Sequence, residues 1–358
     1  MAEAKAGSGA GVRRLTVAAD EAEQRLDRWL KRRLPELTQG RIEKLLRKGE
    51  IRVDGGRAKA SDRLGPGAEI RIPPLAPRAD ADAPPRRPPA KPISDADAAL
   101  VQGWVLHRDD AVLALAKPPG LPVQGGSGQT RHLDGLLDAL RFDRDDRPRL
   151  VHRLDKDTSG VLVLGRTPAA AAKLAQAFRA RDARKLYWAA LSGTPKPRMG
   201  EIRYALLKAP GHGPHGAGEK MLCVAPDLKN RPEGAQAALT LYAVLDALGD
   251  RACWAALRPV TGRTHQLRAH MAEIGCPVVG DGKYGTNRVE KQDGRYGAQL
   301  GGEISRKLHL HARALDLAHP DGGRLRLSAP LPEHMRRTWE SFGWDPDAAA
   351  EDPFEEAS

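Results

Sequence analysis

The sequence is poor in cysteine. It contains three, Cys223, Cys253 and Cys276, and no two of them form a Cys-x-x-Cys pair. This spacing supports neither a disulfide framework nor a cysteine-based zinc site. The chain also lacks any run of about 18 apolar residues that could span a membrane. Residues 1–5 have no apolar core of the kind that marks a secretory signal peptide. We therefore expect a cytoplasmic protein with no membrane partner.

Signals for bound cofactors are missing as well. His265, His270, His309 and His311 have no acidic or cysteine partner that recurs at metal-ligand spacing, and scattered histidines are more often packed or hydrogen-bonded. The glycine-rich residues 125–128 could hold phosphate through backbone amides. They lack the Lys-Ser/Thr ending of a nucleotide-binding P-loop, however. We expect no metal, no nucleotide and no other cofactor.

Positive charge is abundant. The 358 residues include 58 Lys and Arg against 46 Asp and Glu, a net charge of +12. Residues 24–73 hold 14 of these cations and 7 of the anions, so this segment carries more than half of the net charge. Such a balance favours a polyanionic partner, although excess charge alone does not exclude a basic protein without one.

The basic segment has the pattern of a compact module. Two apolar patterns at helical spacing are visible, the first ending at Pro35 and the second running from about Thr38 to Gly49. Short strands are predicted at 51–53 and 69–72. A solvated helix face explains most single Arg-Lys runs, but residues 41–55 resemble the S4 RNA-binding domain. The resemblance and the charge concentration imply phosphate contacts, for which the candidates are Arg25, Arg28, Arg41, Lys44, Arg47 and Lys48.

Composition also divides the chain into parts. Residues 1–13 are small and polar, and we expect them to be disordered. Residues 14–75 form the S4-like module, and residues 76–97, with six prolines, predict an extended linker. A larger catalytic domain is predicted at 98–342, followed by a disordered acidic tail at 343–358. Within the larger domain, residues 208–234 predict a mobile loop near the RNA.

The larger domain is organised around residues 150–164. Gly160 precedes a short run of Val and Leu, residues 161–164, which predicts a buried strand. The charged segment before it places Asp155 where a loop enters the sheet. Asp, Lys, Thr, Ser and Gly are ordinary turn residues, so composition alone would favour a surface turn here.

The order of the residues is more specific. Residues 152–160, His-Arg-Leu-Asp-x-x-Thr-Ser-Gly, resemble the catalytic signature of the Rlu family of RNA pseudouridine synthases. Residues 185–187 and 262–270 are similar to further motifs of that family. The resemblance implies isomerisation of uridine to pseudouridine in RNA, without metal or nucleotide. It also implies an α+β fold, with the S4-like module ahead of a mainly antiparallel mixed sheet flanked by helices.

The resemblance assigns roles to single residues. Asp155 is the essential carboxylate, acting on C1′, on C6 or on the C2′ proton, and Arg268 is its partner. A bidentate, charge-assisted pair would hold the carboxylate ionised. Tyr187 would stack on the detached uracil and could serve as general base at C5, and Arg153 could fill the stack when the uridine flips out. The candidates for substrate binding are Arg153, Lys185, His152, Arg263 and His265.

Several alternatives stay open. The S4-like module and residues 125–128 favour large-subunit ribosomal RNA and the RluC type, although Gln124 stands where that branch usually has histidine. An RluD-type or transfer-RNA-directed synthase is the runner-up. A non-catalytic S4-domain ribosome-assembly factor, or a hydrolase with Asp155 as general base, would belong to other classes. Nothing in the sequence indicates an oligomer, so we expect a monomer.

Overall fold

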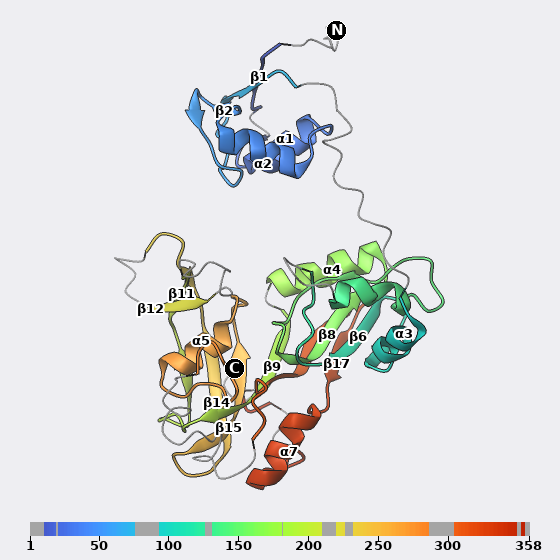
Figure 1. Cartoon of the computed structure of the whole chain (residues 1–358), viewed down its shortest axis with the longest axis vertical. Helices are drawn as coiled ribbons and strands as arrows, with labels where there is room; N and C mark the ends of the chain where they lie inside the picture. The colour runs from blue at the N-terminus through green and yellow to red at the C-terminus, as the bar shows by residue number, and fades with distance from the viewer. Residues whose placement is uncertain are drawn as a thin grey trace. The chain divides into compact units, whose positions relative to one another are not determined.

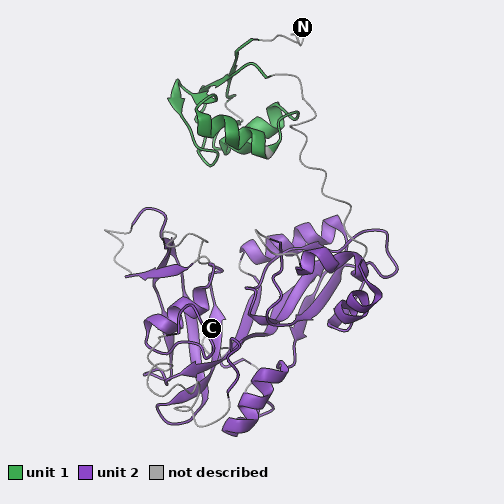
Figure 2. Cartoon of the chain, in the orientation of Figure 1, with its two compact units in different colours: residues 1–92 green, residues 93–358 purple. Residues whose placement is uncertain are grey.

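The computed structural model divides the chain into two compact units, unit 1 (residues 1–92) and unit 2 (residues 93–358), shown in Figure 2. The structure describes residues 11–18, 21–75, 93–125, 131–180, 182–209, 220–225, 232–285, 304–348 and 352–354. Expectations about residues 1–10, 76–92 and 126–128 lie outside this set. Among the described residues, no helix is long and apolar enough to cross a membrane.

Unit 1 combines two helices with a four-stranded antiparallel sheet. Its elements are β1 (Arg13–Thr16), α1 (Leu26–Arg33), α2 (Gln39–Lys48), β2 (Arg52–Val53), β3 (Gly56–Arg57) and β4 (Glu69–Ile72). The strand order is β1-β4-β2-β3. Both predicted helices and both predicted strands are present. Strand β1 was not predicted, and it places Arg13 inside the module rather than in a disordered terminus.

Local sequence signals explain the helix pair. The Thr38 hydroxyl accepts a hydrogen bond from the Arg41 backbone N–H at 3.3 Å, which satisfies one of the free donors at the start of α2. The apolar faces of α1 and α2 meet in the core, where Trp29, Leu30 and Ile42 are fully buried. The basic side chains are thereby left on the outer faces.

Unit 2 contains one large sheet. Its strands are β5 (Val105–Arg108), β6 (Val112–Lys117), β7 (Arg149–Leu150), β8 (Ser159–Gly165), β9 (Arg184–Ser192), β10 (Met199–Ile202), β14 (Thr240–Ala247), β15 (Ala252–Pro259), β16 (Leu310–Ala318) and β17 (Arg324–Ser328). The order is β10-β14-β15-β9-β16-β8-β6-β5, with β17 beside β16 and β7 beside β8. In the described part of the sheet β8 and β16 are parallel, and the other neighbours are antiparallel. The predicted mainly antiparallel mixed sheet is confirmed.

Helices and a small second sheet surround this large sheet (Figure 1). The helices are α3 (Asp95–Gln102), the 3-10 helix η3 (Leu133–Leu140), α4 (Pro168–Ala180), α5 (Gln266–Glu273) and α7 (Glu333–Phe342). The second sheet has the order β12-β11-β13, formed by β11 (Ala205–Lys208), β12 (Met221–Val224) and β13 (Gln236–Ala237). Together with unit 1, this arrangement is the α+β class expected from the sequence.

Strand β8 contains the buried strand predicted at 161–164, and all of its residues are buried. Gly160 has a φ of 110°, and a Cβ at this position would lie 2.2 Å from the carbonyl oxygen of Ala312 on β16. Only glycine permits so close an approach of the two strands. The loop that bears Asp155 therefore leads directly into a fixed part of the sheet.

The boundary between linker and catalytic domain differs from the prediction. Helix α3 begins at Asp95, where the Ser94 hydroxyl accepts a hydrogen bond from the Asp97 N–H. Ile93 packs against a buried cluster of unit 2. Residues 93–97 thus belong to unit 2 and not to the linker. The missed signal is a serine N-cap directly after the proline-rich run.

The C-terminal segment also departs from the prediction. Trp344 and Phe354 are each 3% exposed and complete the aromatic core of unit 2. Arg258 pairs with Asp352. The prediction of a disordered tail is therefore wrong for the described residues 343–348 and 352–354. Burial of two apolar side chains stabilises this segment in spite of its acidic composition.

The predicted mobile loop at 208–234 is only partly described. Met221–Val224 form strand β12 and pair with β11, so these residues are an element of the second sheet. Residues 210–219 and 226–231 of the same stretch lie outside the described residues.

Candidate active site

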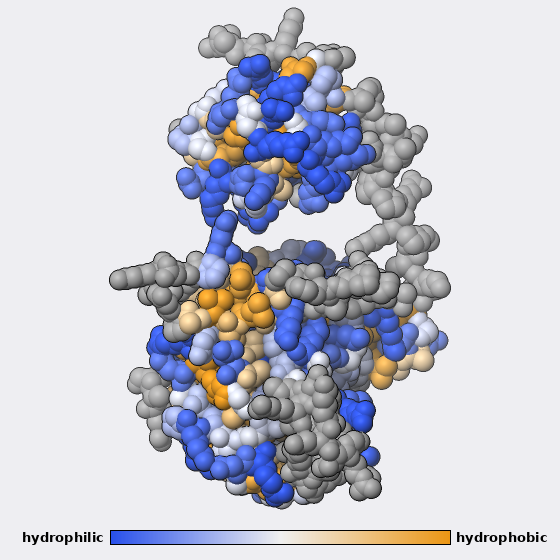
Figure 3. Space-filling model, turned by 60° about the vertical axis from the view of Figure 1, so that its left-hand side comes forward, coloured by the Kyte–Doolittle hydropathy of each residue, from blue (hydrophilic) through white to orange (hydrophobic). Residues whose placement is uncertain are grey.

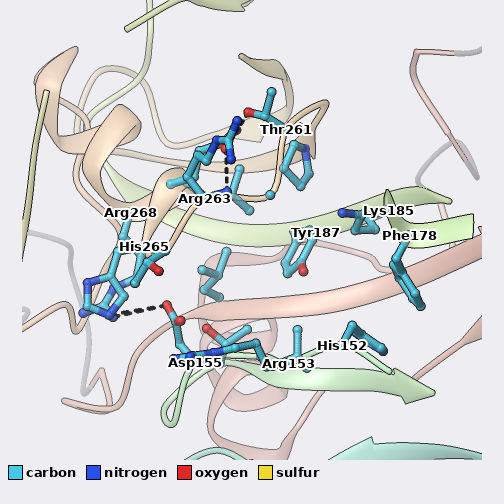
Figure 4. Close-up of a pocket in the computed structure, with 18 residues that line it drawn as sticks. His152, Arg153, Asp155, Phe178, Lys185, Tyr187, Thr261, Arg263, His265 and Arg268 are labelled. Carbon is cyan, nitrogen blue, oxygen red and sulfur yellow. Dashed lines mark hydrogen bonds and ion pairs between the residues drawn. The ribbon is translucent and has the colours of Figure 1, made fainter. Parts of the chain in front are cut away.

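A cavity of about 310 Å³ lies where the loop before β8 meets β9, α4 and the segment between β15 and α5 (Figure 4). This first cavity brings together every catalytic and substrate-binding residue predicted from the sequence. They are Asp155, Tyr187, Arg268, Arg153, Lys185, His152, Arg263 and His265. Side chains more than 100 positions apart in the sequence therefore converge on one hollow.

Asp155 lies between two basic side chains at this cavity. Its Oδ2 is 3.5 Å from Arg268 Nη1 and 3.8 Å from His265 Nε2. The Asp155 side chain is 21% exposed, whereas that of Arg268 is 6% exposed. The carboxylate can thus meet a ligand in the cavity while a largely buried guanidinium attracts and orients it.

The bidentate partner of Arg268 is a different carboxylate from the one predicted. Arg268 Nε and Nη2 each donate to Asp281 at 2.7 Å, and the Asp281 side chain is fully buried. This geometry leaves only Nη1 directed at Asp155. The prediction of a bidentate Asp155–Arg268 pair is therefore wrong in detail, although the two side chains do form an ion pair.

Sequence reasoning assigns Asp281 no role in the site. Besides holding Arg268, its Oδ1 accepts hydrogen bonds from the backbone N–H groups of Lys283 and Tyr284. Burial lowers the pKa of Arg268, but the hydrogen bonds and charge of Asp281, with the charge of Asp155, outweigh it and raise that pKa overall. Asp281 is thus the anchor that keeps Arg268 charged and directed toward Asp155.

His265 precedes α5 in a left-handed backbone conformation, with φ 52°. Its Nδ1 lies 3.0 Å from the Tyr284 hydroxyl, while Nε2 faces Asp155. Burial lowers the pKa of His265 below its ordinary value. The ring is therefore mainly neutral near pH 7, and the firm cation beside Asp155 is Arg268.

The segment ahead of α5 is held by one buried amide. The Gln266 carbonyl oxygen accepts from the Thr261 hydroxyl at 2.7 Å and from the Arg263 N–H at 3.1 Å. Its NH2 group donates to the Leu239 carbonyl at 2.8 Å. Arg263 is also held through Nε, which donates to the Ala237 carbonyl. Gln266 was not predicted as a site residue, yet it orders the wall that carries Arg263 and His265.

Tyr187 stands in the middle of β9, and its ring forms part of the cavity wall (Figure 4). Burial, with the nearby charge of Asp155, raises the pKa of its hydroxyl above the ordinary value of 10.0. The phenol is therefore protonated at neutral pH. This disfavours the predicted general-base role for a phenolate and leaves the role of a flat surface against a base.

His152 and Lys185 lie near Phe178, at the end of the cavity away from His265 and Arg268 (Figure 4). The His152 ring stacks on Phe178 with centroids 4.3 Å apart, and its Nε2 accepts from the Val163 N–H at 2.9 Å. Burial lowers the pKa of His152 to about 3, so the ring is neutral. Lys185 Nζ lies 5.9 Å from the Phe178 centroid. Arg153 is exposed at the mouth of the cavity.

A buried lysine supports the Asp155 loop from behind. Lys117 is 1% exposed, and its Nζ donates to the carbonyl oxygens of Pro118, Leu121 and Lys156 at 2.8, 2.9 and 3.0 Å. The last of these carbonyls belongs to the residue after Asp155. Burial lowers the pKa of Lys117 to about 7.

The basic residues predicted to contact RNA lie on α1 and α2 of unit 1, apart from Arg25, which directly precedes α1. Arg28, Lys44, Arg47 and Lys48 are exposed. Arg25 is held by Asp27, with two hydrogen bonds of 3.1 and 2.7 Å. Figure 3 shows that the visible surface of this unit is mostly hydrophilic.

In the described part of the chain, no three His, Cys, Asp or Glu side chains form a group that could hold a metal ion. What the first cavity offers instead is a carboxylate held by a buried guanidinium beside an aromatic wall. Such a site can hold a planar ring against the aromatic wall and act on it with the carboxylate, and the basic residues of unit 1 can contact a polyanion.

Comparisons with known proteins identify the family. The model described as RNA pseudouridylate synthase matches residues 111–273, and that of the S4 domain matches residues 24–70. Ribosomal large subunit pseudouridine synthase C of Escherichia coli (strain K12) is 33% identical over 334 residues, covering 91% of this chain and 95% of the relative. RNA pseudouridine synthase 4, mitochondrial, of Arabidopsis thaliana is 33% identical over 373 residues, covering 86% and 77%.

A solved structure agrees with these relatives. Human RNA Pseudouridylate Synthase Domain Containing 4 shares 30% sequence identity, with a TM-score of 0.55, over 69% of this chain and 95% of that one. The chain belongs to the RNA pseudouridylate synthase family, and it carries an S4 domain ahead of the synthase domain. The family resemblance of the sequence motifs is thereby confirmed.

Proposed function

We propose that this enzyme converts uridines of large-subunit ribosomal RNA into pseudouridine, with a specificity of the RluC type. Relatives that cover nearly all of the chain are named ribosomal large subunit pseudouridine synthase C, and the S4 domain supplies a general means of holding RNA. The single observation that carries the proposal is the position of Asp155 in the first cavity, facing Arg268 and Tyr187.

The reaction is an isomerisation, so all atoms of the nucleotide are retained. The bond between N1 and C1′ breaks, the uracil turns, and a bond between C5 and C1′ forms, while C5 loses a proton and N1 gains one. In our proposal Asp155 is the group that acts on the nucleotide, and Arg268 pairs with its carboxylate and holds it in place. Asp281 positions Arg268 and does not touch the nucleotide.

The detached uracil must stay in the cavity while it turns. Tyr187 offers a flat face on which the base can stack, and its protonated hydroxyl can donate a hydrogen bond to a uracil carbonyl. His265 and Arg263 close the same wall, and Lys185 lies at its far end. Arg153, exposed at the mouth, is placed to fill the space left by a flipped-out uridine.

Unit 1 holds the RNA by its backbone in this proposal. Arg25, Arg28, Arg41, Lys44, Arg47 and Lys48 supply phosphate contacts, which position an enzyme on RNA but read little sequence. The cytoplasmic location, the monomeric state and the absence of a cofactor remain predictions. The mitochondrial name of the Arabidopsis relative makes the compartment a separate experimental question.

Pseudouridine mapping of ribosomal RNA tests the proposal. Cells that lack this protein are complemented with the wild type, with Asp155→Asn, or with Asp250→Asn as a matched control. Asp250 pairs with Lys196 on the surface, where it is 75% exposed. We expect defined large-subunit pseudouridines to disappear and to return with the wild type and the control, but not with Asp155→Asn.

Other outcomes contradict separate parts of the proposal. If large-subunit sites persist and transfer-RNA sites vanish, the RluC-type specificity is wrong and the enzyme is directed at transfer RNA. If Asp155→Asn restores the modification, Asp155 is not the reacting group. If no RNA site changes in the deletion strain, a non-catalytic RNA-binding factor becomes the better hypothesis.

A further inference from the structure

A second cavity, of about 360 Å³, adjoins the catalytic ion pair. Its described wall includes Asp157, Arg268, Gly280, Lys283, Arg306 and Lys307. Arg268 lines both this cavity and the first one. Whatever occupies the second cavity therefore lies beside the arginine that pairs with Asp155. None of the predicted roles uses this space.

The lining of the second cavity is strongly basic. Among the described residues that line it, four are cations, Arg268, Lys283, Arg306 and Lys307, and one, Asp157, is an anion. The side chains of Lys283, Arg306 and Lys307 are exposed, and all three line the second cavity. An excess of cations around one hollow favours an anion over a neutral or cationic occupant.

The backbone that presents these cations is fixed. Gly280 has a φ of 76°, and a Cβ there would lie 2.0 Å from the Lys307 carbonyl oxygen, so the turn at 280 and the segment at 307 are in close contact. The same carbonyl accepts a hydrogen bond from His309 Nδ1 at 2.8 Å. The wall is therefore built before any ligand arrives.

The wall also shares its anchor with the catalytic pair. Asp281 Oδ1 accepts the Lys283 N–H at 2.9 Å, while the same carboxylate holds Arg268 with two hydrogen bonds. The Lys283 backbone and the Arg268 guanidinium are thus held by one buried side chain. The backbone of the second cavity and the partner of Asp155 therefore share one support.

We propose that the second cavity binds a backbone phosphate of the RNA strand whose uridine occupies the first cavity. This inference rests on the proposed function. A phosphodiester carries the required negative charge and accepts hydrogen bonds from Lys and Arg side chains at two oxygens. Binding it beside Arg268 fixes the sugar of the target nucleotide relative to Asp155 without reading the sequence.

The test compares two double variants with equal changes of charge. Lys307→Gln/Arg306→Gln removes two cations from the second cavity. Lys196→Gln/Arg203→Gln removes two that pair with Asp250 and Glu201 on the surface and line neither cavity. Both proteins are assayed on an in vitro transcript of large-subunit ribosomal RNA. We expect KM to rise about tenfold for the first variant and to stay within about twofold for the control.

Salt dependence and phosphate replacement locate the phosphate. For the first variant, the slope of log KM against log salt should fall by about 0.7 for each phosphate that the protein no longer neutralises. In an oligoribonucleotide around a mapped uridine, one phosphate is replaced by a neutral methylphosphonate. At one position this replacement should raise the KM of the wild type and leave the KM of the double variant unchanged. Lys283→Gln, which keeps the backbone bond to Asp281, should reproduce the effect in weaker form.

The outcomes separate this inference from the proposed function. If the wild type forms pseudouridine and the double variant matches its control, the phosphate site is wrong and the proposed function stands. The phosphate site is also wrong if no single methylphosphonate position changes the KM of the wild type and the double variant differently. If the wild type modifies no RNA at all, the proposed function fails, and this inference fails with it.

Discussion

The two units use positive charge in opposite ways. In unit 1 the cations of α1 and α2 are mostly exposed, and Lys48, for example, pairs with the partly exposed Glu50. In unit 2 Arg268 and Lys117 are almost fully buried, and their hydrogen bonds are directed at defined oxygens. Exposed cations can follow a phosphate backbone, whereas buried ones can hold a reacting group in a single place.

The difference has an energetic basis. An exposed ion pair contributes about 0–1 kcal/mol, so unit 1 can exchange one cation for another at little cost. A buried ion is costly to remove from water, and it is retained only where hydrogen bonds and an opposite charge offset that cost. The bonds from Arg268 to Asp281 meet this condition. Matched changes in the two units, and one acid titration in unit 1, test the contrast.

The largest effect is expected from a glycine in each unit. Gly160→Ala would place a methyl group 2.2 Å from the Ala312 carbonyl oxygen, so we expect a loss of about 4 kcal/mol or more and little folded protein. Gly55 in unit 1 also has a positive φ, 79°, but a Cβ there meets no atom within 4 Å. Gly55→Ala should cost about 1–2 kcal/mol. Urea unfolding of both variants measures the difference, and equal costs would contradict the close β8–β16 approach.

Next is the removal of one carboxylate from an ion pair in each unit. Asp281→Asn leaves Arg268 buried with a single acceptor at that position, and we expect a loss of roughly 3–5 kcal/mol in the free energy of unfolding. Glu69→Gln in unit 1 removes the partner of Arg14, where both side chains are about half exposed or more. This change should cost about 1 kcal/mol or less. If Asp281→Asn is as mild as Glu69→Gln, Asp281 is not the anchor described above.

Exchange of arginine for lysine tests catalysis. Arg268→Lys keeps the charge but cannot donate two bonds to Asp281 and also face Asp155, so we expect the rate at saturating RNA to fall about a hundredfold. Arg28→Lys on α1 should change the rate by less than about twofold. Single-turnover assays on ribosomal RNA transcripts measure both. An active Arg268→Lys enzyme would show that charge alone suffices beside Asp155.

The sequence could predict the parts of this contrast that depend on local pattern. Helix α2 follows from its Thr38 cap and apolar spacing, and β8 follows from a run of Val and Leu. Two family motifs predict Asp155 and Arg268 in one site, and both residues line the first cavity. These features require only residues that are near one another in the chain or in a recognisable motif.

The remaining features depend on contacts between distant segments. Asp281 holds Arg268 because the turn after α5 returns to that helix, and no spacing in the sequence reports such a contact. Burial of Trp344 and Phe354 depends in the same way on the core that they join. The acidic composition predicted disorder there, because composition does not show which apolar side chains are buried by contacts with distant segments.

The smallest effect concerns Glu21, a nearly buried acid of unit 1. Hydrogen bonds, above all from Arg33 and then from Trp29 Nε1, outweigh its desolvation and lower the pKa of Glu21 from 4.5 to about 2. Because the pKa is lower in the folded state, the contribution of Glu21 to stability is complete above about pH 4.5. It is lost as the pH falls toward 2.

Glu21→Gln should therefore destabilise unit 1 at pH 7 and remove its part of the acid sensitivity below pH 4.5. Trp29 is the only tryptophan among residues 1–92 of the sequence, so its indole N–H resonance reports on this unit within the full chain. We expect that resonance to shift in the wild type between pH 4.5 and 2 and to stay unchanged in the variant. If both proteins respond equally to acid, the pairing of Glu21 with the exposed cations around it does not stabilise unit 1. The two units would then differ completely in whether their ion pairs contribute to stability.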